Sequence, residues 1–516
     1  MKYAAINIGP IVDTISMARK PRELWAASYL FSFLMECIIK TIKEKGKTII
    51  SPASVEGDEK IGVGLYPDRI YLEDITDEEL KDVVDKAFLA FAGTDIGQDY
   101  VNVMYVSIES EDGEGVIRKL NRLLDCTELY NRPVGDESRE GVLGLIQSKK
   151  DSSLFRHAFG NPEFNIQTLG EIATYQLSKL EGKAEVWKKL CIDARKKEEN
   201  KRAVELEKAE DEFYKQIKAE FKNDYHSYHK YICVVQADGD NMGSIISALK
   251  NEEVMTLSAA LLGYGEKACG MIKEFGGLPI YAGGDDLLFL APVVSDKGNI
   301  FGLLSEIDDC YKKTVDEAID KNNISRPKKD GKELHTSLSY GLSVSYYKYP
   351  LYEALKSARE LLFDTAKNVQ EKNAIAWCLR KHSGTGFSGS FCKDASGGQV
   401  YQIFTKLMTC SESEKVISAI AHKLRQNEDL LEIIRKSKDK ESRMTAFYHK
   451  VMEEENPEKD SYLKDTRGLL CALFDSYVET KEDKEGKTRP ITKILTTMYG
   501  MLRTAKFING EGDEDE

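Results

Sequence analysis

Residues 281–289 read YAGGDDLLF, and this stretch determines the fold that we expect. Two adjacent glycines between apolar runs are typical of a tight hairpin turn, because glycine adopts a positive φ without steric cost. The turn would carry Asp285 and Asp286 at the tip of a buried hairpin. Since two adjacent carboxylates repel each other, the pair favours a site in which a divalent cation lies between them and another acidic group.

That other acidic group stands earlier in the chain. Residues 231–243 read YICVVQADGDNMG, and the apolar, β-branched run 231–235 is typical of a buried strand. The segment 244–274 has helical apolar spacing, so a strand, a helical connection and a hairpin can bring both acidic tips to one sheet edge. Hard oxygen ligands suit Mg²⁺ or Mn²⁺ and not zinc. The sequence therefore predicts a site for these ions at Asp238, Asp240, Asp285 and Asp286.

A basic residue follows on a predicted helix. Residues 352–367 read YEALKSARELLFDTAK with apolar residues at helical spacing, and residues 336–346 before them alternate like a strand. The order of strand, helix, hairpin, strand and helix predicts a ferredoxin-like βαββαβ palm, which is an α+β fold. We expect nucleotide phosphates to contact the lysine at the end of this helix, backbone N–H groups at the start of an earlier helix, and the hairpin turn. These predicted contacts are Lys367, Gly239, Asn241, Met242, Gly243 and Gly284.

These groups fit nucleotidyl transfer from a nucleoside triphosphate. Two cations about 4 Å apart can hold an in-line displacement at phosphorus, one activating a ribose hydroxyl and the other neutralising the leaving pyrophosphate. Each part also has a structural interpretation: GGDD as a surface turn, Asp238 and Asp240 as helix caps, and Lys367 as a solvated residue. Their order along the chain favours the joint catalytic interpretation, with Asp238, Asp285 and Asp286 as the catalytic set.

The same window resembles the second palm of the large, polymerase-like subunit of type III CRISPR effector complexes. The resemblance is carried by ADGDNMG (237–243), YAGGDDLLF (281–289), and the segments 338–367 and 372–384. Residues 8–32 are similar to the start of the first palm in the subtype III-B (Cmr) version. Residues 497–508 are similar to the end of its helical domain. Head, middle and tail match in the same order, whereas GGDD alone would also suit a diguanylate cyclase.

The resemblance implies an enzyme that makes a nucleotide second messenger from ATP when its complex binds target RNA. The product would be a cyclic oligoadenylate, or AMP joined to S-adenosylmethionine. It implies two Mg²⁺ or Mn²⁺ ions held by Asp238 and Asp285, with Asp286 as a second acidic partner and Lys367 on the triphosphate. The implied partners are the other Cmr subunits, guide RNA and target RNA. A catalytically inert scaffold subunit and a free-standing diguanylate cyclase remain the alternatives.

Two features depart from the pattern of many relatives. No His-Asp dipeptide occurs and the first histidine is His157, so we expect no DNase of the histidine–aspartate type. The 10 cysteines include no C-x-x-C pair, so we expect no structural zinc.

Bulk properties set outer limits. A chain of 516 residues suggests three or four domains. The net charge of −13 argues against a protein that coats nucleic acid by itself, so we expect partner subunits to hold most of the RNA. No run of ~18 uncharged apolar residues and no signal sequence are evident, and scattered cysteines fit a reducing compartment. We therefore expect a cytoplasmic protein that does not span a membrane.

The pattern along the chain predicts six segments. In the first palm, Pro67-Asp68-Arg69 replaces the paired carboxylates of the hairpin, so we expect this palm to be degenerate. The Lys/Glu-rich stretch after it has opposite charges at i,i+4 spacing and predicts one long exposed helix. The segments are a degenerate palm (1–180), a charged helical linker (181–229), an active palm (230–382), a Gly/Ser-rich loop (383–398), a helical domain (399–510) and an acidic tail (511–516).

Overall fold

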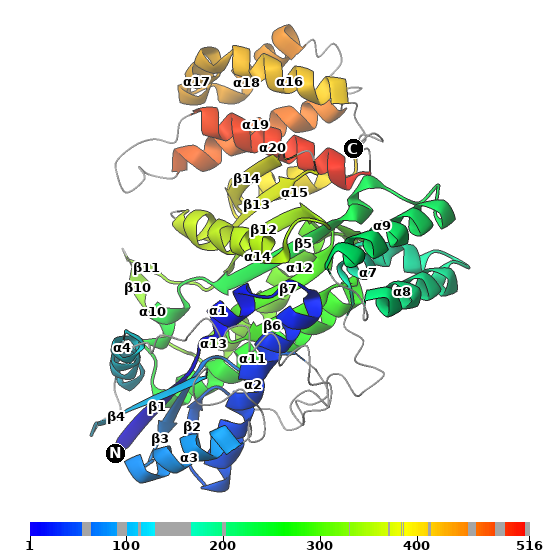
Figure 1. The fold of residues 1–516 in the computed structure, drawn as a ribbon. Coiled ribbons are helices and arrows are strands. Elements are labelled where there is room, and N and C mark those ends of the chain that lie inside the picture. Colours follow the sequence, from blue (N-terminus) through cyan, green and yellow to red (C-terminus); the bar gives the residue numbers. More distant parts are fainter. Residues whose placement is uncertain are drawn as a thin grey trace.

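Two sheet-containing domains and a helical domain are stacked along the long axis of the protein in a computed structural model (Figure 1). The N-terminal palm lies at one end, a second palm in the middle and the helical domain at the other end. The structure describes residues 1–53, 63–89, 101–111, 115–129, 167–198, 203–329, 331–369, 372–382, 384, 386–410, 414–452, 461–479 and 491–510. The predicted acidic tail, 511–516, lies outside the described residues.

The first palm has the ferredoxin-like topology that the sequence predicts. Its sheet has the order β2-β3-β1-β4, and the paired neighbours are antiparallel. The hairpin predicted within 61–73 is wrong in its first strand, because β3 pairs with β2 at 48–51 and the described residues 63–68 form no strand. The elements are β1 (Lys2–Gly9), α1 (Ile11–Ser16), α2 (Pro21–Glu44), β2 (Thr48–Ser51), β3 (Arg69–Glu73), α3 (Asp77–Leu89), β4 (Asn102–Glu109) and α4 (Val116–Glu128).

Helix α2 is the core helix of the first palm. It begins with Pro21 in its first turn, where the missing N–H breaks no hydrogen bond, and Trp25 is 2% exposed. Among the described residues it is the one helix long and apolar enough to cross a membrane by length and composition. Its apolar side chains instead pack in a shared core with Ile232, Val234 and Leu288 of the second palm. Burial on several faces accounts for its composition.

The second palm repeats the topology and extends it. Its sheet has the order β14-β13-β12-β5-β7-β6, in which β12-β5-β7-β6 is the ferredoxin-like part and β13 joins β12 in parallel. This confirms the predicted fold class. The elements are β5 (Tyr231–Gly239), α10 (Met242–Ile246), α11 (Asn251–Phe275), β6 (Leu278–Gly283), β7 (Asp286–Pro292), β8 (Val294–Ser295), β9 (Gly298–Asn299), α12 (Ile300–Tyr311), α13 (Glu317–Lys321), β10 (Lys328–Lys329), β11 (Lys332–Glu333), β12 (Leu338–Tyr346), α14 (Leu351–Glu360), β13 (Ala374–Arg380) and β14 (Gly386–Cys392).

The two palms are joined through equivalent helices and edge strands. Ser28 on α2 donates its hydroxyl to the carbonyl of Ile280 on β6 (2.9 Å). In the reverse direction, the N–H of Ala53, after β2, donates to the hydroxyl of Ser258 on α11 (2.8 Å). The N–H of Ala282 also donates to the carbonyl of Gly64 (2.8 Å). The first palm therefore holds the edge strand that leads into the GGDD turn.

The single exposed helix predicted for the linker is wrong. The structure has α8 (Ala184–Glu198) and α9 (Ala203–Glu220), which pack on each other, on α7 (Leu169–Ala173) and on a 3₁₀ turn at Tyr175–Lys179. Arg195 forms a two-pronged ion pair with the buried carboxylate of Glu171 (2.6 Å for each bond). The charge spacing indicated that the segment is helical but did not indicate that the helices have an apolar face. This face packs in a small hydrophobic core formed by Leu177, Cys191, Phe213, Tyr214, Ile217, Phe221 and Tyr347.

The Gly/Ser-rich loop predicted over 383–398 is also wrong in its middle part. Residues 386–392 form β14, which pairs with β13. A Cβ at Gly389 would lie 2.3 Å from the buried indole of Trp377 on β13, so glycine is needed there for the ring. The glycines that indicated a loop therefore serve close packing within a strand.

The helical domain lies against this extension of the sheet. Thr504 on α20 accepts a hydrogen bond from the indole N–H of Trp377 (3.0 Å), and Gly500 lies against the backbone of Ser388. The helical pattern predicted over 399–510 is confirmed for the described residues. The helices are α15 (Gln399–Leu407), α16 (Glu414–Gln426), α17 (Glu428–Lys436), α18 (Lys440–Phe447), α19 (Ser461–Glu479) and α20 (Ile491–Ile508).

Gly341 provides a test of how closely α14 packs on the sheet. A Cβ there would lie 2.0 Å from the carbonyl oxygen of Ala358 and 2.6 Å from the nitrogen of Leu362, both of which are backbone atoms. We expect Gly341→Ala to lower the free energy of unfolding by about 3 kcal/mol or more. The matched control is Gly270→Ala in α11, where a Cβ meets nothing within 4 Å. It should stabilise by roughly 1 kcal/mol in urea unfolding. Equal effects of the two variants would contradict the packing argument.

Candidate active site

The acidic ends of β5 and of the β6–β7 hairpin lie next to each other. Ala237 is paired with Leu287, so the carboxyl end of β5 lies beside the first residue of β7. Gly283 is paired with Asp286, which leaves Gly284 and Asp285 as the turn, and Gly284 has a φ of +66° as a tight turn requires. The structure thus brings together the three aspartates that the sequence predicts as catalytic: Asp238, Asp285 and Asp286.

Asp285 lies directly over the end of β5. A Cβ added to Gly239 would lie 2.5 Å from the Oδ2 of Asp285, so the absence of a side chain at this position admits the carboxylate. Burial, and next the negative charge of Asp238, raise the pKa of Asp285 to about 7. Burial and the charge of Asp285 raise the pKa of Asp286 well above its ordinary value. The site therefore gathers negative charge that a cation would stabilise.

Lys367 supplies the positive charge of the site. Helix α14 continues into a π-helical turn (Leu361–Thr365) and a 3₁₀ turn (Ala366–Asn368), which directs this lysine toward the end of β5. Its Nζ donates to the carbonyls of Asp238 (2.9 Å) and Gly239 (2.7 Å) and forms an ion pair with the carboxylate of Asp238. Burial alone would lower the pKa of Lys367, but the charges of Asp238 and Asp240 outweigh it and raise the pKa.

Asp240 is fully buried, unlike the three other aspartates. Its Oδ1 accepts from the Nζ of Lys367 (2.9 Å), and its Oδ2 accepts from the hydroxyl of Ser337 (2.7 Å) and the N–H of Asn373 (2.9 Å). The hydroxyl of Ser339 reaches both oxygens (3.0 and 2.9 Å). The lone pairs of Asp240 are therefore directed at protein donors.

The predicted phosphate contacts differ in what they can offer. Met242 is 3% exposed and belongs to the core, so only its backbone is placed for binding. Asn241 occupies the N-cap position of α10 in the left-handed region, and its side chain makes no bond to that helix but donates to the carbonyl of His335 (3.1 Å). A Cβ at Gly243 or Gly284 would meet nothing within 4 Å, so a ligand can approach the backbone there.

Sequence reasoning missed a carboxylate that the first palm contributes. The charge of Asp68 adds to the raised pKa of Asp286, after burial and the charges of Asp285 and Asp238. Burial, and next the charge of Asp286, raise the pKa of Tyr281. The charge of Asp68 adds to this increase. In the sequence, the triplet Pro67-Asp68-Arg69 indicated only that the first palm lacks the catalytic acids. The effect of Asp68 on the site depends on the contact between the two palms, which a sequence pattern does not reveal.

The donor set fits a magnesium-type ion in its chemistry. The groups that converge are carboxylate oxygens, which Mg²⁺ and Mn²⁺ prefer, and their pKa values are raised by burial and next by the charges of neighbouring carboxylates. Within the described ranges, no three His, Cys, Asp or Glu side chains already form a coordination cage. The carboxylate of Asp238 faces the ammonium of Lys367 as well as the carboxyl group of Asp286. Holding an ion would therefore require Asp238 to share its carboxylate between Lys367 and the metal.

The raised pKa of Asp285 predicts a pH effect on the metal-free protein. A carboxyl whose pKa is about 7 in the fold and ordinary when unfolded favours the fold below pH ~4, and that contribution is lost as the pH rises to about 7. The loss should be roughly 2–4 kcal/mol, reduced by coupling to Asp286. Thermal unfolding in EDTA should therefore fall more steeply between pH 5 and 8 in the wild type than in Asp285→Asn. Parallel curves would contradict this assignment.

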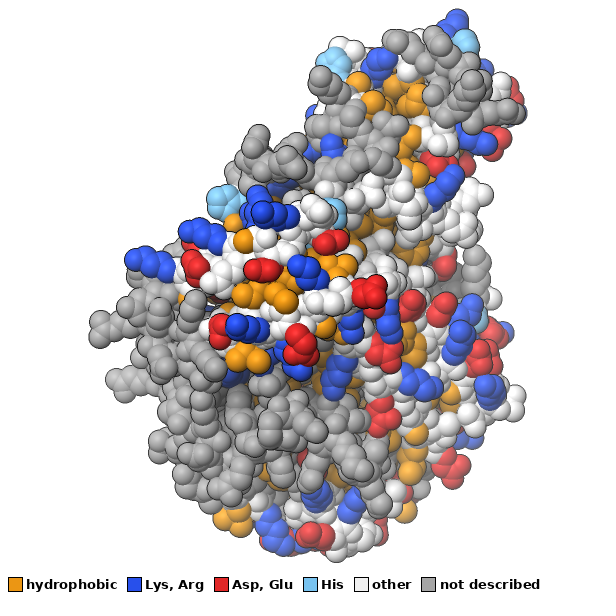
Figure 2. All heavy atoms as spheres, turned by 90° about the vertical axis from the view of Figure 1, so that its right-hand side faces the viewer, with side chains coloured by type: hydrophobic (Ala, Val, Ile, Leu, Met, Phe, Trp, Pro, Cys, Tyr) orange, Lys and Arg blue, Asp and Glu red, His pale blue; other side chains and the backbone are white. Residues whose placement is uncertain are grey.

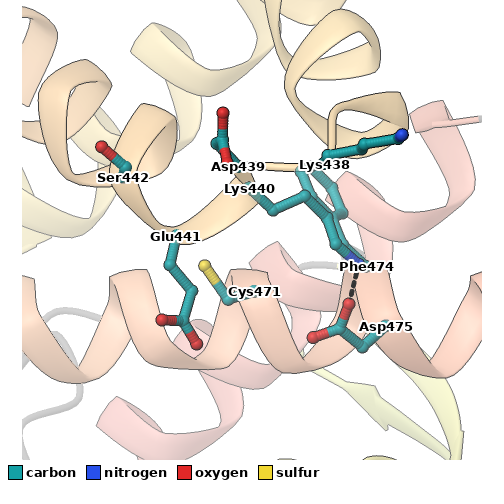
Figure 3. A pocket seen from close by; sticks show the side chains of 8 residues that line it. All are labelled: Lys438, Asp439, Lys440, Glu441, Ser442, Cys471, Phe474 and Asp475. Atoms are coloured by element: carbon teal, nitrogen blue, oxygen red, sulfur yellow. Dashed lines mark hydrogen bonds and ion pairs between the residues drawn. The ribbon is translucent and has the colours of Figure 1, made fainter.

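A hollow in the helical domain lies apart from the predicted site. It lies between α18 and α19 in the helical domain and has a volume of about 440 Å³ (Figure 3). Lys440 forms an ion pair with Asp475 across it, and burial raises the pKa of Cys471 to about 11. None of the predicted site residues lines it. The chemistry indicated by the sequence therefore belongs to the palm and not to this hollow.

Two stretches of the chain match known protein families. Residues 231–376 match the family described as Cas10/Cmr2, second palm domain. Residues 3–82 match the family described as CRISPR-associated protein Cmr2, N-terminal. The CRISPR system Cmr subunit Cmr2 of Pyrococcus furiosus is 30% identical over 216 residues, which cover 37% of this chain and 23% of that relative.

Solved structures share the fold along nearly the whole chain. A type III-B Cmr-beta cryo-EM structure of the apo state superposes with a TM-score of 0.56 at 12% identity, covering 99% of this chain and 82% of that one. A Csm1–Csm4 cassette crystallised with cA4 gives a TM-score of 0.51 at 12% identity, covering 98% and 70%. At these identities the likeness concerns the arrangement of domains.

Proposed function

Because the chain belongs to the Cas10/Cmr2 family of type III-B CRISPR palm proteins, we propose that its second palm is a nucleotidyltransferase that makes a nucleotide second messenger from ATP. The observation that carries the proposal is the convergence of Asp238, Asp285 and Asp286 beside the ammonium of Lys367. A decayed palm would have no reason to retain neighbouring carboxylates whose raised pKa values oppose folding at neutral pH.

The reaction follows from what each residue can do. Asp238 and Asp285 are the proposed ligands of two Mg²⁺ or Mn²⁺ ions, with Asp286 as the further acidic partner. Such ions, when bound, activate a 3′-hydroxyl and neutralise charge on the α-phosphate and the leaving pyrophosphate. Lys367 holds a positive charge next to the triphosphate, and the open backbone at Gly243 and Gly284 lets phosphate oxygens approach N–H groups.

The proposed partners are the remaining Cmr subunits and the RNA that they hold. Acidic and basic side chains are interspersed over the described part of the face that carries α8 and α9 (Figure 2). Such a surface, with the net charge of −13, favours RNA binding through partner subunits. A chain of a Cmr-beta complex bound to cognate target RNA shares this fold, and this supports the proposal that target RNA activates the palm.

The product is either a cyclic oligoadenylate or AMP joined to S-adenosylmethionine. Csm1–Csm4 cassettes solved with cA4 and with AMPPNP favour adenine nucleotides for the shared fold. The test is to incubate the assembled complex with labelled ATP, Mg²⁺ or Mn²⁺ and cognate RNA, with and without S-adenosylmethionine, and to identify the products by mass spectrometry. We expect product only with RNA. Silence under all conditions would favour an inert scaffold, and activity of the isolated chain on GTP would favour a diguanylate cyclase.

A further inference from the structure

We propose that Asp240 is a positioning residue that fixes Lys367 at the end of β5, and that it does not ligate a metal ion. The inference rests on the proposed function of this palm and assigns a distinct task to one of its four aspartates. It separates Asp240 from Asp238, two positions earlier in the same sequence motif.

The donors around Asp240 leave its carboxylate without a free direction. A carboxylate offers about four lone-pair sites. Ser337 and Asn373 donate to Oδ2, Lys367 donates to Oδ1, and Ser339 reaches both oxygens. The side chain is 0% exposed, so a metal ion could reach it only by displacing these protein donors. Breaking such a buried set is unfavourable because the displaced donors would lose their partners.

The backbone that supplies one of these donors is itself constrained. Lys372 and Asn373 are consecutive non-glycine residues in the left-handed region, with φ of +55° and +43°. This conformation is unfavourable for residues with a Cβ and persists where the surroundings enforce it. The N–H of Asn373 donates to Asp240, and its carbonyl accepts from the N–H of Lys393 (2.8 Å). The loop is therefore shaped around the carboxylate of Asp240.

The contacts of Lys367 explain why a second carboxylate is needed. An ammonium has three protons to donate. Those of Lys367 reach the carbonyls of Asp238 and Gly239, the carboxylate of Asp240 and that of Asp238. Of the two carboxylates, only that of Asp238 is partly exposed (26%), and it is a proposed metal ligand. Asp240 thus keeps Lys367 in place when Asp238 turns toward a cation.

The experiment separates metal binding from lysine positioning in the EDTA-treated full chain. Mn²⁺ affinity is measured by electron paramagnetic resonance, and binding of a non-hydrolysable ATP analogue by calorimetry. Asp240→Asn should keep the Mn²⁺ affinity within about 3-fold of the wild type, whereas Asp238→Asn should lose on the order of 30-fold or more. Asp240→Asn and Lys367→Ala should each weaken analogue binding about 10- to 100-fold, and the double variant should be no weaker than Lys367→Ala. Loss of Mn²⁺ affinity in Asp240→Asn equal to that in Asp238→Asn would overturn the proposal, as would additive losses in the double variant.

Two further variants separate loss of lysine positioning from a general loss of stability. Asp308 is a partly buried aspartate paired with a buried lysine, Lys393 (2.5 Å), and it accepts from the hydroxyl of Tyr340 (2.9 Å), the neighbour of Ser339 on β12. Asp308→Asn should lower thermal stability and leave both affinities unchanged. If Asp240→Asn does not fold, Ser339→Ala removes one donor and keeps the charge. It should weaken analogue binding about 2- to 5-fold, and unchanged binding would overturn the proposal. A wild-type chain that binds neither Mn²⁺ nor the analogue would instead refute the proposed function.

Discussion

Replacing Asp285 by alanine is expected to lower formation of the nucleotide product by on the order of 10³-fold or more, because a carboxylate that would hold the catalytic ions supports several kcal/mol of transition-state stabilisation. Asp285 lies in the turn between β6 and β7 and reaches over Gly239 to the end of β5. No other described side chain occupies that position. The measurement is product formation by the assembled complex with labelled ATP and cognate RNA.

The same variant should make the metal-free protein more stable at pH 8. Burial and the charge of Asp238 raise the pKa of Asp285 to about 7, so the ionised carboxylate opposes folding above that pH. A loss of activity together with a higher melting temperature cannot be explained by unfolding. Binding to partner subunits and to target RNA should be unchanged. Retained activity would refute the catalytic role, and failure of assembly would point to a structural role.

The parts of the site that are local in sequence could be predicted from it. Glycines at a turn between apolar runs indicated the hairpin, and a β-branched run before Asp238 indicated the strand that meets it. Both palms have the expected ferredoxin-like order of strands. These features depend on backbone preference and on hydrophobic period, which a single sequence displays directly.

The features that were missed depend on tertiary contacts. The enclosure of Asp240 brings together Ser337 and Ser339 at the start of β12 with Asn373 before β13, and the charge of Asp68 acts on Asp286 through the docking of one palm on the other. The strand β14 was mistaken for a loop because its glycine is needed for the ring of Trp377. A glycine in the sequence can thus indicate either a turn or a close contact within a strand, and only the packing distinguishes the two cases.

Adding one methyl group at Gly239 is expected to lower activity by about 10²-fold or more, although no charge is changed. The Cβ of Gly239→Ala would lie 2.5 Å from the Oδ2 of Asp285 and 2.6 Å from its Cβ, so the aspartate must move. A displacement of about 1 Å of a catalytic group is sufficient for a loss of this size. Mn²⁺ affinity should fall as well, because the same carboxylate is a proposed ligand.

Steric displacement of Asp285 makes a further prediction that a general loss of stability does not. In the double variant Gly239→Ala/Asp285→Ala, activity should be no lower than in Asp285→Ala alone, because the methyl group then has no carboxylate to displace. The matched control is Gly302→Ala on α12, where a Cβ meets nothing within 4 Å, and it should retain activity. An active Gly239→Ala enzyme would show that Asp285 works from another position. Multiplicative losses in the double variant would show that Gly239 acts independently of it, for example through its carbonyl bond to Lys367.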